Sequence, residues 1–461
     1  MKLAVIGAGY VGLTTAACLA ELRQTVVCAD IDSHRIARLR RGEIPIYEPG
    51  LDRLVTANMA RHRLSFSDAP PSASAEADAV FIAVGTPSAA NGEIDLSFVE
   101  QAGRQIAPML KPNAVVVVKS TVPSGACRQL REIIAEARGA LDFSVACNPE
   151  FLREGSAVED FLRPDRIVIG TDDAHAEALL RSIYAPFSRR GVPIVATTPA
   201  NAELIKYAAN AFLALKIGFI NDVANLCEVV GGNVAAVAQG IGLDRRIGWA
   251  FLNAGPGFGG SCFPKDTRGL AATGRRFDAP QPLIEALVAA NEQRKRTMVS
   301  RLLRELPGAG APVAVLGLGF KGGTSDIREA LSLDIIPALL EAKADVRVHD
   351  PLIGPEILRR FPGVDSFESP FMAASEAEVV AILTDDEAYR RLDLARLRRA
   401  MAGRTLVDFR NLLDPEAVAE HDFRYISIGR PIADAGEPKR QSRRRHAASR
   451  PEVSLTLIST Q

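Results

Sequence analysis

Cys262 lies in the segment whose residue types and spacing best suit covalent chemistry. The run FLNAGPGFGGSCFPKD has five glycines or prolines within six positions before the cysteine, which leaves backbone N–H groups free to surround a ligand. Lys265 and Asp266 follow three and four residues later. Because a neighbouring cation lowers the pKa of a thiol, Cys262 is the best nucleophile candidate among the six cysteines. The alternative is a small buried side chain, which apolar or helical surroundings predict for the others: Cys18, Cys28, Cys127, Cys147 and Cys227.

Lys206 and Asn210 are four residues apart in an alanine-rich stretch that predicts a helix, so they project from one face of it. The neighbouring alanines keep that face slim enough for a ligand to approach. A ligand site and a solvated helix face are both compatible with this pattern.

Two polar loops follow apolar runs that predict strands. NPEFLREG, residues 148–155, supplies Glu150 and Glu154, and STVPSG, residues 120–125, supplies hydroxyl groups. Ligands of parallel α/β sheets bind at the carboxyl ends of the strands, so a shared crevice is favoured over two ordinary loops.

Gly7, Gly9 and Gly12 form G-x-G-x-x-G after a predicted strand and at the start of a helix, which is the context of a dinucleotide site. Asp30 ends the next strand, where a carboxylate accepts hydrogen bonds from the adenosine ribose and repels a 2′-phosphate. NAD is therefore favoured over NADP, although Arg35 weakens that preference.

A second G-x-G-x-x-G, at Gly317, Gly319 and Gly322, also follows a predicted strand, and Asp350 ends the strand after it. A second NAD site is the simplest interpretation. Lys321 in the spacer favours instead the diphosphate of another ligand, so that one crevice would bind the cofactor and the other a nucleotide-linked substrate. A purely structural second fold is equally compatible with these residues.

The elements that must position these residues form two α/β regions around a helical one. With about 150 residues per domain as a guide, 461 residues predict two or three domains. Strand and helix signals alternate over residues 1–195, which predicts a mostly parallel sheet. Strand signals stop over residues 196–300, where a helix is expected from Pro199 past Ala224. The alternation restarts over residues 301–435.

Charge and cysteine content exclude several classes of protein. Lysine plus arginine and aspartate plus glutamate both total 55, which predicts neither a nucleic-acid binder nor a membrane-surface protein. The six cysteines include no Cys-x-x-Cys pair, so we expect reduced thiols in a cytosol and no metal site. The N-terminus resembles neither a signal peptide nor a membrane span.

The tail, residues 436–461, is arginine-rich and is expected to be disordered. It is either inert or docks on an acidic partner or anionic membrane. Its positive charge means that the neutral total conceals a mildly acidic folded body.

Nine separated motifs resemble, in order and spacing, the UDP-glucose/GDP-mannose dehydrogenase family over about residues 1–430. They are MKLAVIGAGYVGL, EIPIYEPGL, VGTP, STVPSG, NPEFLREGSAVEDFLRPDRIVIG, AELIKYAANAFLALKIGFIND, GFGGSCFPKD, GLGFKGGTSDIRE and DFRN. The resemblance implies two Rossmann-like, doubly wound parallel-sheet domains, joined by a long central helix within a helical dimerisation region. The first domain would bind NAD and the second the UDP-sugar.

The activity that the resemblance implies is a four-electron oxidation of UDP-glucose to UDP-glucuronate with two NAD⁺. The same chemistry on GDP-mannose or a UDP-N-acetylhexosamine is an alternative, as is a two-electron NAD-dependent dehydrogenase or a non-catalytic NAD-responsive protein. Cys262 would form a thiohemiacetal and then a thioester, and Glu150 would assist hydrolysis. The residues implied to remove protons and stabilise the oxyanion, with a water, are Lys206, Asn210, Asp266 and Thr121. Lys206 would act either as a base or through its charge alone.

The ligand contacts are also implied by the resemblance. The NAD contacts, beside the first three glycines, are Val11, Asp30, Arg35, Thr86, Thr121, Glu154, Lys265 and Arg328. The substrate contacts are Glu150, Phe151, Leu152, Glu154, Lys206, Asn210, Phe251, Leu252, Asn253, Ala254, Gly255, Gly259, Lys321 and Arg410. Arg246 would reach the substrate of the adjacent subunit of a homodimer or larger homo-oligomer. Where the family usually has Thr-Glu-Trp, this sequence has Thr384, Asp385 and Asp386, and where the family has Asn-Glu it has Asn221 and Asp222.

Overall fold

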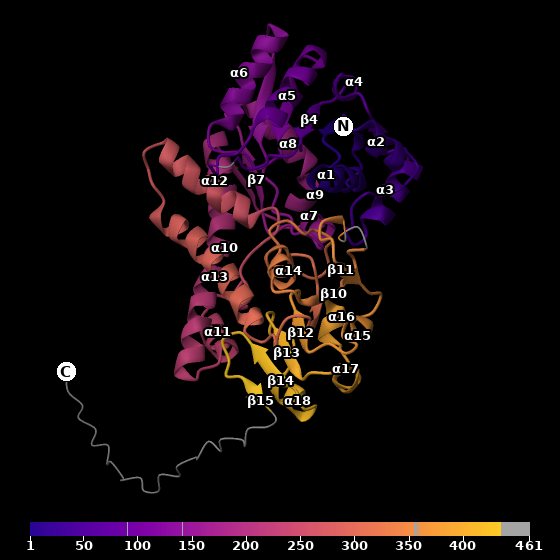
Figure 1. Cartoon of the computed structure of the whole chain (residues 1–461). Coiled ribbons are helices and arrows are strands. Elements are labelled where there is room, and N and C mark those ends of the chain that lie inside the picture. The colour runs from indigo at the N-terminus through magenta and orange to yellow at the C-terminus, as the bar shows by residue number, and fades with distance from the viewer. Residues whose placement is uncertain (90, 141, 355–356, 358, 435–461) are drawn as a thin grey trace, which may run out of the picture.

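Two α/β bodies lie at opposite ends of the molecule, with long helices running along one side of both (Figure 1). The computed structural model describes all residues except 90, 141, 355–356, 358 and 435–461. The predicted tail therefore lies outside the described residues.

The first body is an eight-stranded sheet in the order β3-β2-β1-β4-β5-β6-β7-β8. All neighbouring strands are parallel except β6 and β7, which pair antiparallel at Cys147 and Gly170. The order from β3 to β6 is that of a doubly wound dinucleotide-binding sheet, which confirms the predicted fold class. The strands are β1 Lys2–Ile6, β2 Thr25–Ala29, β3 Leu64–Ser67, β4 Ala79–Ile82, β5 Ala114–Val118, β6 Phe143–Cys147, β7 Ile167–Gly170 and β8 Ile194–Thr197.

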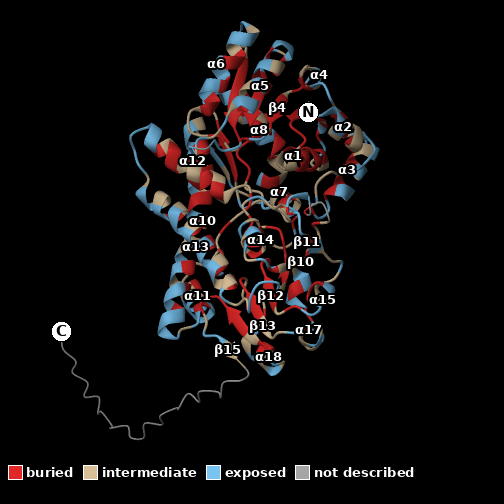
Figure 2. Ribbon diagram, in the orientation of Figure 1, coloured by how far each residue is buried: buried red, intermediate tan, exposed pale blue. Residues whose placement is uncertain are grey.

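Alternating residues of the buried strands pack in two hydrophobic cores, one on each face of this sheet. In β5, Val115 and Val117 join one core, whereas Val116 joins the other. Helices cover both faces, so the strands are apolar throughout (Figure 2). The helices are α1 Tyr10–Glu21, α2 Ser33–Arg40, α3 Leu51–Ala60, α4 Pro70–Ser74, α5 Ser97–Ile106, α6 Ala126–Arg138, α7 Ala157–Leu162, α8 Ala174–Ile183 and α9 Ala185–Ser188.

The second body is a seven-stranded sheet in the order β11-β10-β9-β12-β13-β14-β15, parallel except for β15. The strands are β9 Pro312–Leu316, β10 Asp345–His349, β11 Val364–Ser366, β12 Val379–Ile382, β13 Thr405–Asp408, β14 Arg424–Ser427 and β15 Ala433–Asp434. The helices are α14 Ser332–Glu341, α15 Pro370–Ala373, α16 Glu387–Arg390, α17 Leu394–Ala400 and α18 Pro415–Glu420.

The long central helix is α10, Pro199–Val230, of 32 residues. Thr198 caps it by accepting a hydrogen bond from the Asn201 N–H, and Gly231 ends it in the left-handed conformation. Ala202 near its start packs in a core of the first body, whereas Ala224 near its end packs in the core of the second. One continuous helix thus contacts both bodies. The other helices of this region are α11 Val234–Gly242, α12 Phe263–Arg276 and α13 Pro282–Leu303.

The two glycine motifs have different structures. Gly9 directly precedes α1, whereas no helix begins at Gly322, because α14 starts only at Ser332. The N–H groups of Gly322 and Gly323 instead donate to the carboxylates of Asp385 and Asp386, at 2.9 and 3.2 Å. The simplest interpretation of the second motif, a second NAD site, is therefore wrong. No helix begins at this turn to bind a pyrophosphate, and the amides of Gly322 and Gly323 already donate to acidic side chains.

Gly12 is the tightest point of the first turn, because a Cβ there would lie 1.8 Å from the carbonyl oxygen of Gly7. Gly12→Ala should therefore destabilise the first domain by about 1–3 kcal/mol. Gly9→Ala is the matched control, because a Cβ at Gly9 meets nothing within 4 Å. Thermal unfolding should show a lower midpoint for Gly12→Ala and an unchanged midpoint for Gly9→Ala. Equal midpoints for the two variants would show that the close approach is not a constraint.

Candidate active site

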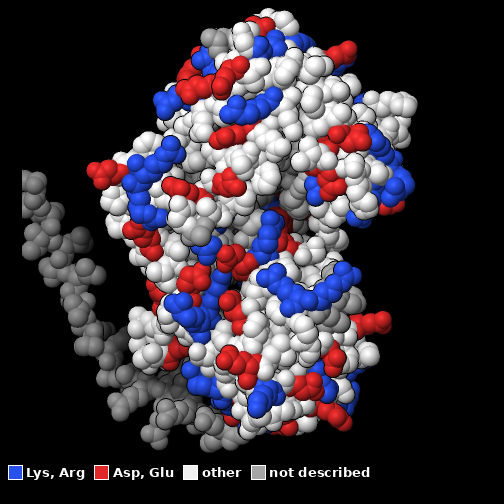
Figure 3. All heavy atoms as spheres, turned by 45° about the horizontal axis from the view of Figure 1, so that its top comes forward, with Lys and Arg blue, Asp and Glu red and all other residues white. Residues whose placement is uncertain are grey.

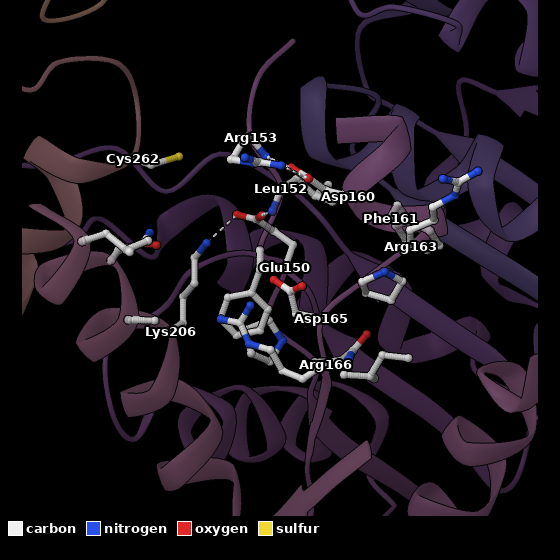
Figure 4. A pocket seen from close by; sticks show the side chains of 18 of the residues that line it. Glu150, Leu152, Arg153, Asp160, Phe161, Arg163, Asp165, Arg166, Lys206 and Cys262 are labelled. Carbon is white, nitrogen blue, oxygen red and sulfur yellow. Dashed lines mark hydrogen bonds and ion pairs between the residues drawn. The ribbon is translucent and has the colours of Figure 1, made fainter. Parts of the chain in front are cut away.

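Four of the six predicted catalytic residues line a cavity of about 650 Å³ between the loop after β6, α10 and the start of α12, whereas Asp266 and Thr121 do not line it. Glu150, Lys206 and Cys262 lie around it in Figure 4, and Asn210 also lines it. Of the two polar loops expected to share a crevice, the loop at residues 148–155 contributes Glu150 to this cavity, whereas no residue of the loop at 120–125 lines it.

Glu150 and Lys206 form a buried ion pair. The Lys206 Nζ lies 3.0 Å from the Glu150 Oε1, and the two side chains are 3% and 6% exposed (Figure 4). Burial would raise the pKa of Glu150, but the Lys206 charge and the Leu152 N–H, which donates at 2.5 Å, keep it below its usual value. Burial would likewise lower the pKa of Lys206, but Glu150 holds it above its usual value. A solvated helix face is thereby excluded for Lys206.

Asn210 and Lys265 both bind Asp266, which is 1% exposed in the first turn of α12. The Asn210 Nδ2 donates to Asp266 Oδ2 at 2.5 Å, and the Lys265 Nζ lies 2.6 Å from Oδ1. Lys265 is therefore paired with a carboxylate and is not the cation that acts on the thiol.

Cys262 directly precedes α12, and it is half-buried, whereas the other five cysteines are buried. Its pKa is raised to about 11, first by burial and then by the Glu150 charge, against the opposing effect of Lys206. A neighbouring cation thus lowers this pKa as expected, but the cation is Lys206, and the net shift in the protein without ligands is upward. The reason is that burial and two carboxylates, those of Glu150 and Asp266, outweigh the Lys206 charge and the Ser261 hydrogen bond. The buried positions predicted for the other five cysteines are confirmed.

Glu154 joins three parts of the structure. Its carboxylate accepts hydrogen bonds from Ser261 at 3.0 Å, Thr324 at 3.4 Å and Arg328 at 3.3 Å. Burial and the nearby Asp326 carboxylate raise the pKa of Glu154 to about 7. The loop after β6 is in this way tied both to the cysteine segment and to the second body.

Glu48 holds the same loop from the side of the first glycine turn. This buried carboxylate accepts from the N–H groups of Gly155 and Ala157, at 2.8 and 2.7 Å, and from the Tyr10 hydroxyl. Tyr10 directly follows Gly9, so the loop that carries Glu150 is linked to the turn at the first strand. No local pattern in the motif EIPIYEPGL indicates the role of Glu48, because that role arises from tertiary contacts alone.

A second cavity, of about 410 Å³, lies over the first glycine turn and includes Gly7, Gly9, Asp30 and Arg35. Asp30 accepts from the Ala8 N–H at 2.7 Å and from Arg35 Nη1 at 3.0 Å. These residues fit a dinucleotide, because open space above Gly9 admits a pyrophosphate at the start of α1. Thr86 is buried beyond β4, and Val11 and Thr121 are half-buried after Gly9 and β5.

A third cavity, of about 400 Å³, joins much of the predicted nucleotide-sugar site. It is lined by Leu252, Asn253, Ala254, Gly255 and Arg410, together with residues that the prediction did not include: Trp249, Asp385, Arg390 and Arg430. Of these four residues, the sequence drew attention to Asp385 alone, because it differs from the residue usual in the family.

The remaining predicted substrate residues lie in different places. Phe251, Phe151 and Leu152 line the first cavity. Gly259 packs against the second body, because a Cβ there would lie 2.3 Å from the Glu329 carbonyl oxygen. Lys321 is half-buried, which lowers its pKa, and its Nζ lies 5.6 Å from the centre of the Phe320 ring.

Arg246 lies on the surface of the single chain and is one of several predicted site residues outside the three cavities. Its side chain is 89% exposed and pairs with Asp244, and it lines none of the three cavities above. The structure of a single chain does not test the predicted contact of Arg246 with an adjacent subunit, which stays a prediction.

Two negative findings concern the described residues alone. In that part of the chain, no group of three or more His, Cys, Asp or Glu side chains is placed to hold a metal ion. No helix there is both long and apolar enough to cross a bilayer.

Comparisons with known proteins agree with this geometry. The NAD binding, central and UDP binding domains of the UDP-glucose/GDP-mannose dehydrogenase family match residues 1–188, 200–293 and 314–415. A relative named UDP-glucose 6-dehydrogenase, from Rhizobium meliloti (strain 1021), is 49% identical over 436 residues, which are 94% of this chain and 100% of the relative.

Two solved structures extend the comparison. A UDP-glucose dehydrogenase from Pyrobaculum islandicum is 40% identical, with a TM-score of 0.84 over 92% of this chain and 96% of its own. A UDP-D-ManNAc dehydrogenase from Pyrococcus horikoshii is 27% identical, with a TM-score of 0.82 over 93% of this chain and 99% of its own. The chain thus belongs to the UDP-glucose/GDP-mannose dehydrogenase family and is an enzyme whose cofactor is NAD.

Proposed function

We propose that this enzyme is a UDP-glucose 6-dehydrogenase, which oxidises UDP-glucose to UDP-glucuronate. The observation that carries the proposal is Cys262 in one cavity with the buried Glu150–Lys206 pair. A two-electron dehydrogenase has no need of such a thiol. UDP-glucose is favoured over other nucleotide sugars by the relatives: the matches named for UDP-glucose are 49% and 40% identical, whereas the one named for UDP-D-ManNAc is 27% identical.

The proposed reaction removes two hydrides and three protons from one alcohol and one water. Two NAD⁺, bound one after the other, would accept the two hydrides. The C6 alcohol first becomes an aldehyde, and the Cys262 sulfur adds to it to give a thiohemiacetal. Loss of the second hydride leaves a thioester, which water cleaves to a carboxylate while the thiol is regenerated. Covalent attachment keeps the aldehyde from escaping between the two oxidations.

The side chains around the thiol supply charge and proton acceptors in this proposal. The raised pKa of Lys206 supports a cation at neutral pH, so we assign it to stabilising oxyanions at C6 rather than to removing protons. Glu150 is ionised and serves as the base for the hydrolytic water. Asp266 and Thr121, with a water, would complete the proton path, and the Asn210 amide would stabilise the oxyanion by hydrogen bonding.

The Cys262 thiol must lose its proton as the sulfur attacks rather than before. With a pKa of about 11, the thiol is neutral in the protein without ligands at physiological pH. As the S–C bond forms, the thiol proton is passed on and the aldehyde oxygen takes up a proton to become the hydroxyl of the thiohemiacetal. The Lys206 ammonium is placed to stabilise the negative charge that develops on that oxygen.

The bound molecules are proposed to occupy the two remaining cavities. NAD would lie on Gly7, Gly9 and Gly12, with Asp30 at the ribose and the other implied contacts around it. The nucleotide of the substrate would lie in the cavity at Leu252–Gly255, with Arg410 and Lys321 as its cations. On the face shown in Figure 3, acidic and basic side chains are mixed along the hollow between the two bodies. These anions would therefore be bound by individual side chains and not by a large positive surface potential.

Domain boundaries follow from the same assignment. We propose an NAD-binding domain at 1–195, a helical domain at 196–300 and a UDP-sugar-binding domain at 301–435. The six unpaired cysteines support a cytosolic location, where thiols stay reduced.

We also propose a homodimer through the central helix α10. Phe212, Phe219 and Leu226 recur every seven residues along it and are 63%, 55% and 61% exposed, and Val229 near its end is 84% exposed. A row of this kind on one helix face is typical of a helix–helix contact, because a lone surface seldom exposes so much contiguous apolar area. Arg246, exposed nearby in sequence, would then be free to reach the partner's site.

The function is tested by counting NADH. Purified enzyme with limiting UDP-glucose should form two NADH per nucleotide sugar, and Cys262→Ala should lose acid formation by at least about 10³-fold. GDP-mannose and two UDP-N-acetylhexosamines serve as comparison substrates, with lower kcat/KM expected. A ratio of one, or full acid formation by Cys262→Ala, would contradict the covalent route.

Thiol ionisation provides a second prediction. The rate of alkylation of Cys262 by iodoacetamide, without ligands, should rise with pH toward a midpoint of about 11. Glu150→Gln removes a negative charge that raises this pKa, so its midpoint should fall by roughly one pH unit. Cys262→Ala is the control for labelling elsewhere. An unchanged midpoint in Glu150→Gln would mean that the carboxylate does not act on the thiol.

Oligomeric state is predicted to depend on α10. Phe219→Asp places a charge in the exposed apolar row and should convert a dimer to a monomer in analytical ultracentrifugation. Met372→Asp, at an exposed apolar residue of α15, is the matched control and should leave the dimer intact. A dimer that survives Phe219→Asp would exclude this face as the interface.

A further inference from the structure

A second buried lysine, Lys119, lines the cavity that holds Glu150 and Lys206, and the proposed mechanism does not use it. It directly follows β5 and is 5% exposed. Its Nζ donates to the Asn148 Oδ1 at 3.0 Å and lies 5.8 Å from the centre of the Phe161 ring. Within the described residues no carboxylate lies within ion-pair distance of it. A buried cation whose direct partners are neutral is unfavourable unless other charges compensate it.

The hydrogen bonds of Asn148 fix the position of this ammonium group. The Asn148 Nδ2 donates to the Val168 carbonyl at 2.7 Å, so its Oδ1 faces the opposite way. That oxygen also accepts from the Tyr184 hydroxyl at 2.5 Å. Both ends of the Asn148 amide therefore form hydrogen bonds, which fixes the oxygen that accepts from Lys119 and so fixes the position of the ammonium group.

The charge that compensates Lys119 is that of Glu150. The titratable groups that face the lysine are Glu150, Lys206, Cys147 and Tyr184, of which Glu150 is the ionised acid. Burial lowers the pKa of Lys119 to about 8, against the opposing effect of Glu150, so the lysine remains mostly protonated at neutral pH. In return, the Lys119 charge helps to keep the pKa of Glu150 low.

We propose that Lys119 is the positioning cation that keeps Glu150 ionised while Lys206 is engaged with the substrate oxygen. This inference rests on the proposed function. Lys206 cannot stabilise the Glu150 carboxylate and the substrate oxyanion fully at the same time, because its ammonium lies 3.0 Å from Glu150 before the substrate binds. When it turns to the oxyanion, the buried carboxylate loses its nearest cation, and burial favours the protonated acid. The fixed charge of Lys119 remains, and Glu150 stays a base for thioester hydrolysis.

The test is the pH dependence of hydrolysis in Lys119→Met. Acyl-enzyme formed from UDP-glucose and NAD⁺ is quenched at intervals, and the thioester at Cys262 is followed by mass spectrometry. We expect at least about tenfold slower hydrolysis at pH 7 and a profile shifted to higher pH by about one unit, since the loss of a cation raises the pKa of a carboxylate. The first hydride transfer should change much less. An unshifted profile would overturn the proposal.

A double variant separates this role from a general structural one. In Glu150→Gln the carboxylate is absent, so adding Lys119→Met should slow hydrolysis no further than about twofold. Losses that multiply in full would show that Lys119 does not act through Glu150. Lys119→Arg, which keeps the charge, should restore much of the rate, and failure to do so in a folded variant would also count against the proposal.

Controls keep other failures distinguishable. Lys111→Met removes a lysine that pairs with Asp78 before the opposite end of β5, and it should leave hydrolysis unchanged. If Lys119→Met does not fold, Asn148→Asp offers a second route, because the new carboxylate would take up the Lys119 charge and shift the profile upward in the same way. An unchanged profile in that variant contradicts the proposal. Two NADH per UDP-glucose in the wild type, measured first, shows whether the proposed function itself holds.

Discussion

The buried ion pair between Glu150 and Lys206 is the interaction on which the site depends. Removing two charges from water costs several kcal/mol for each ion, so the pair persists only where rigid elements fix both partners. The loop after β6 supplies the acid, and the continuous helix α10 supplies the lysine. The same pair sets the charge around Cys262, because Glu150 raises the pKa of the thiol while Lys206 lowers it. Sulfur chemistry, oxyanion stabilisation and hydrolysis are thereby linked through two side chains.

The site is also held between the two bodies rather than within one. Glu48 fixes the loop after β6 to the first glycine turn, and Glu154 fixes it to the cysteine segment and to Arg328 of the second body. With a pKa of about 7, Glu154 changes charge near physiological pH, so the contact between the bodies is sensitive to protonation there. The helix α10, packed in cores of both bodies, limits how far they can separate.

Local patterns predicted much of the fold. Thr198, Pro199 and the alanines after them indicated α10, and the first glycine turn with Asp30 indicated the nucleotide cavity. What failed depended on distant partners. Lys265 was expected to act on the thiol but pairs with Asp266. The second glycine turn resembles the first in sequence, but its Gly322 amide donates to the distant Asp385. The roles of Glu48 and Lys119 were not predicted, because they arise from packing between segments that are far apart in sequence.

The covalent thioester at Cys262 is the central claim, and it can be observed directly. Glu150→Gln, mixed with UDP-glucose and NAD⁺ and quenched in acid, should carry the UDP-glucuronyl mass on the peptide that contains Cys262, because hydrolysis lacks its base while both oxidations proceed. Formation of UDP-glucuronate by this variant with no adduct at Cys262 at any time would contradict the account.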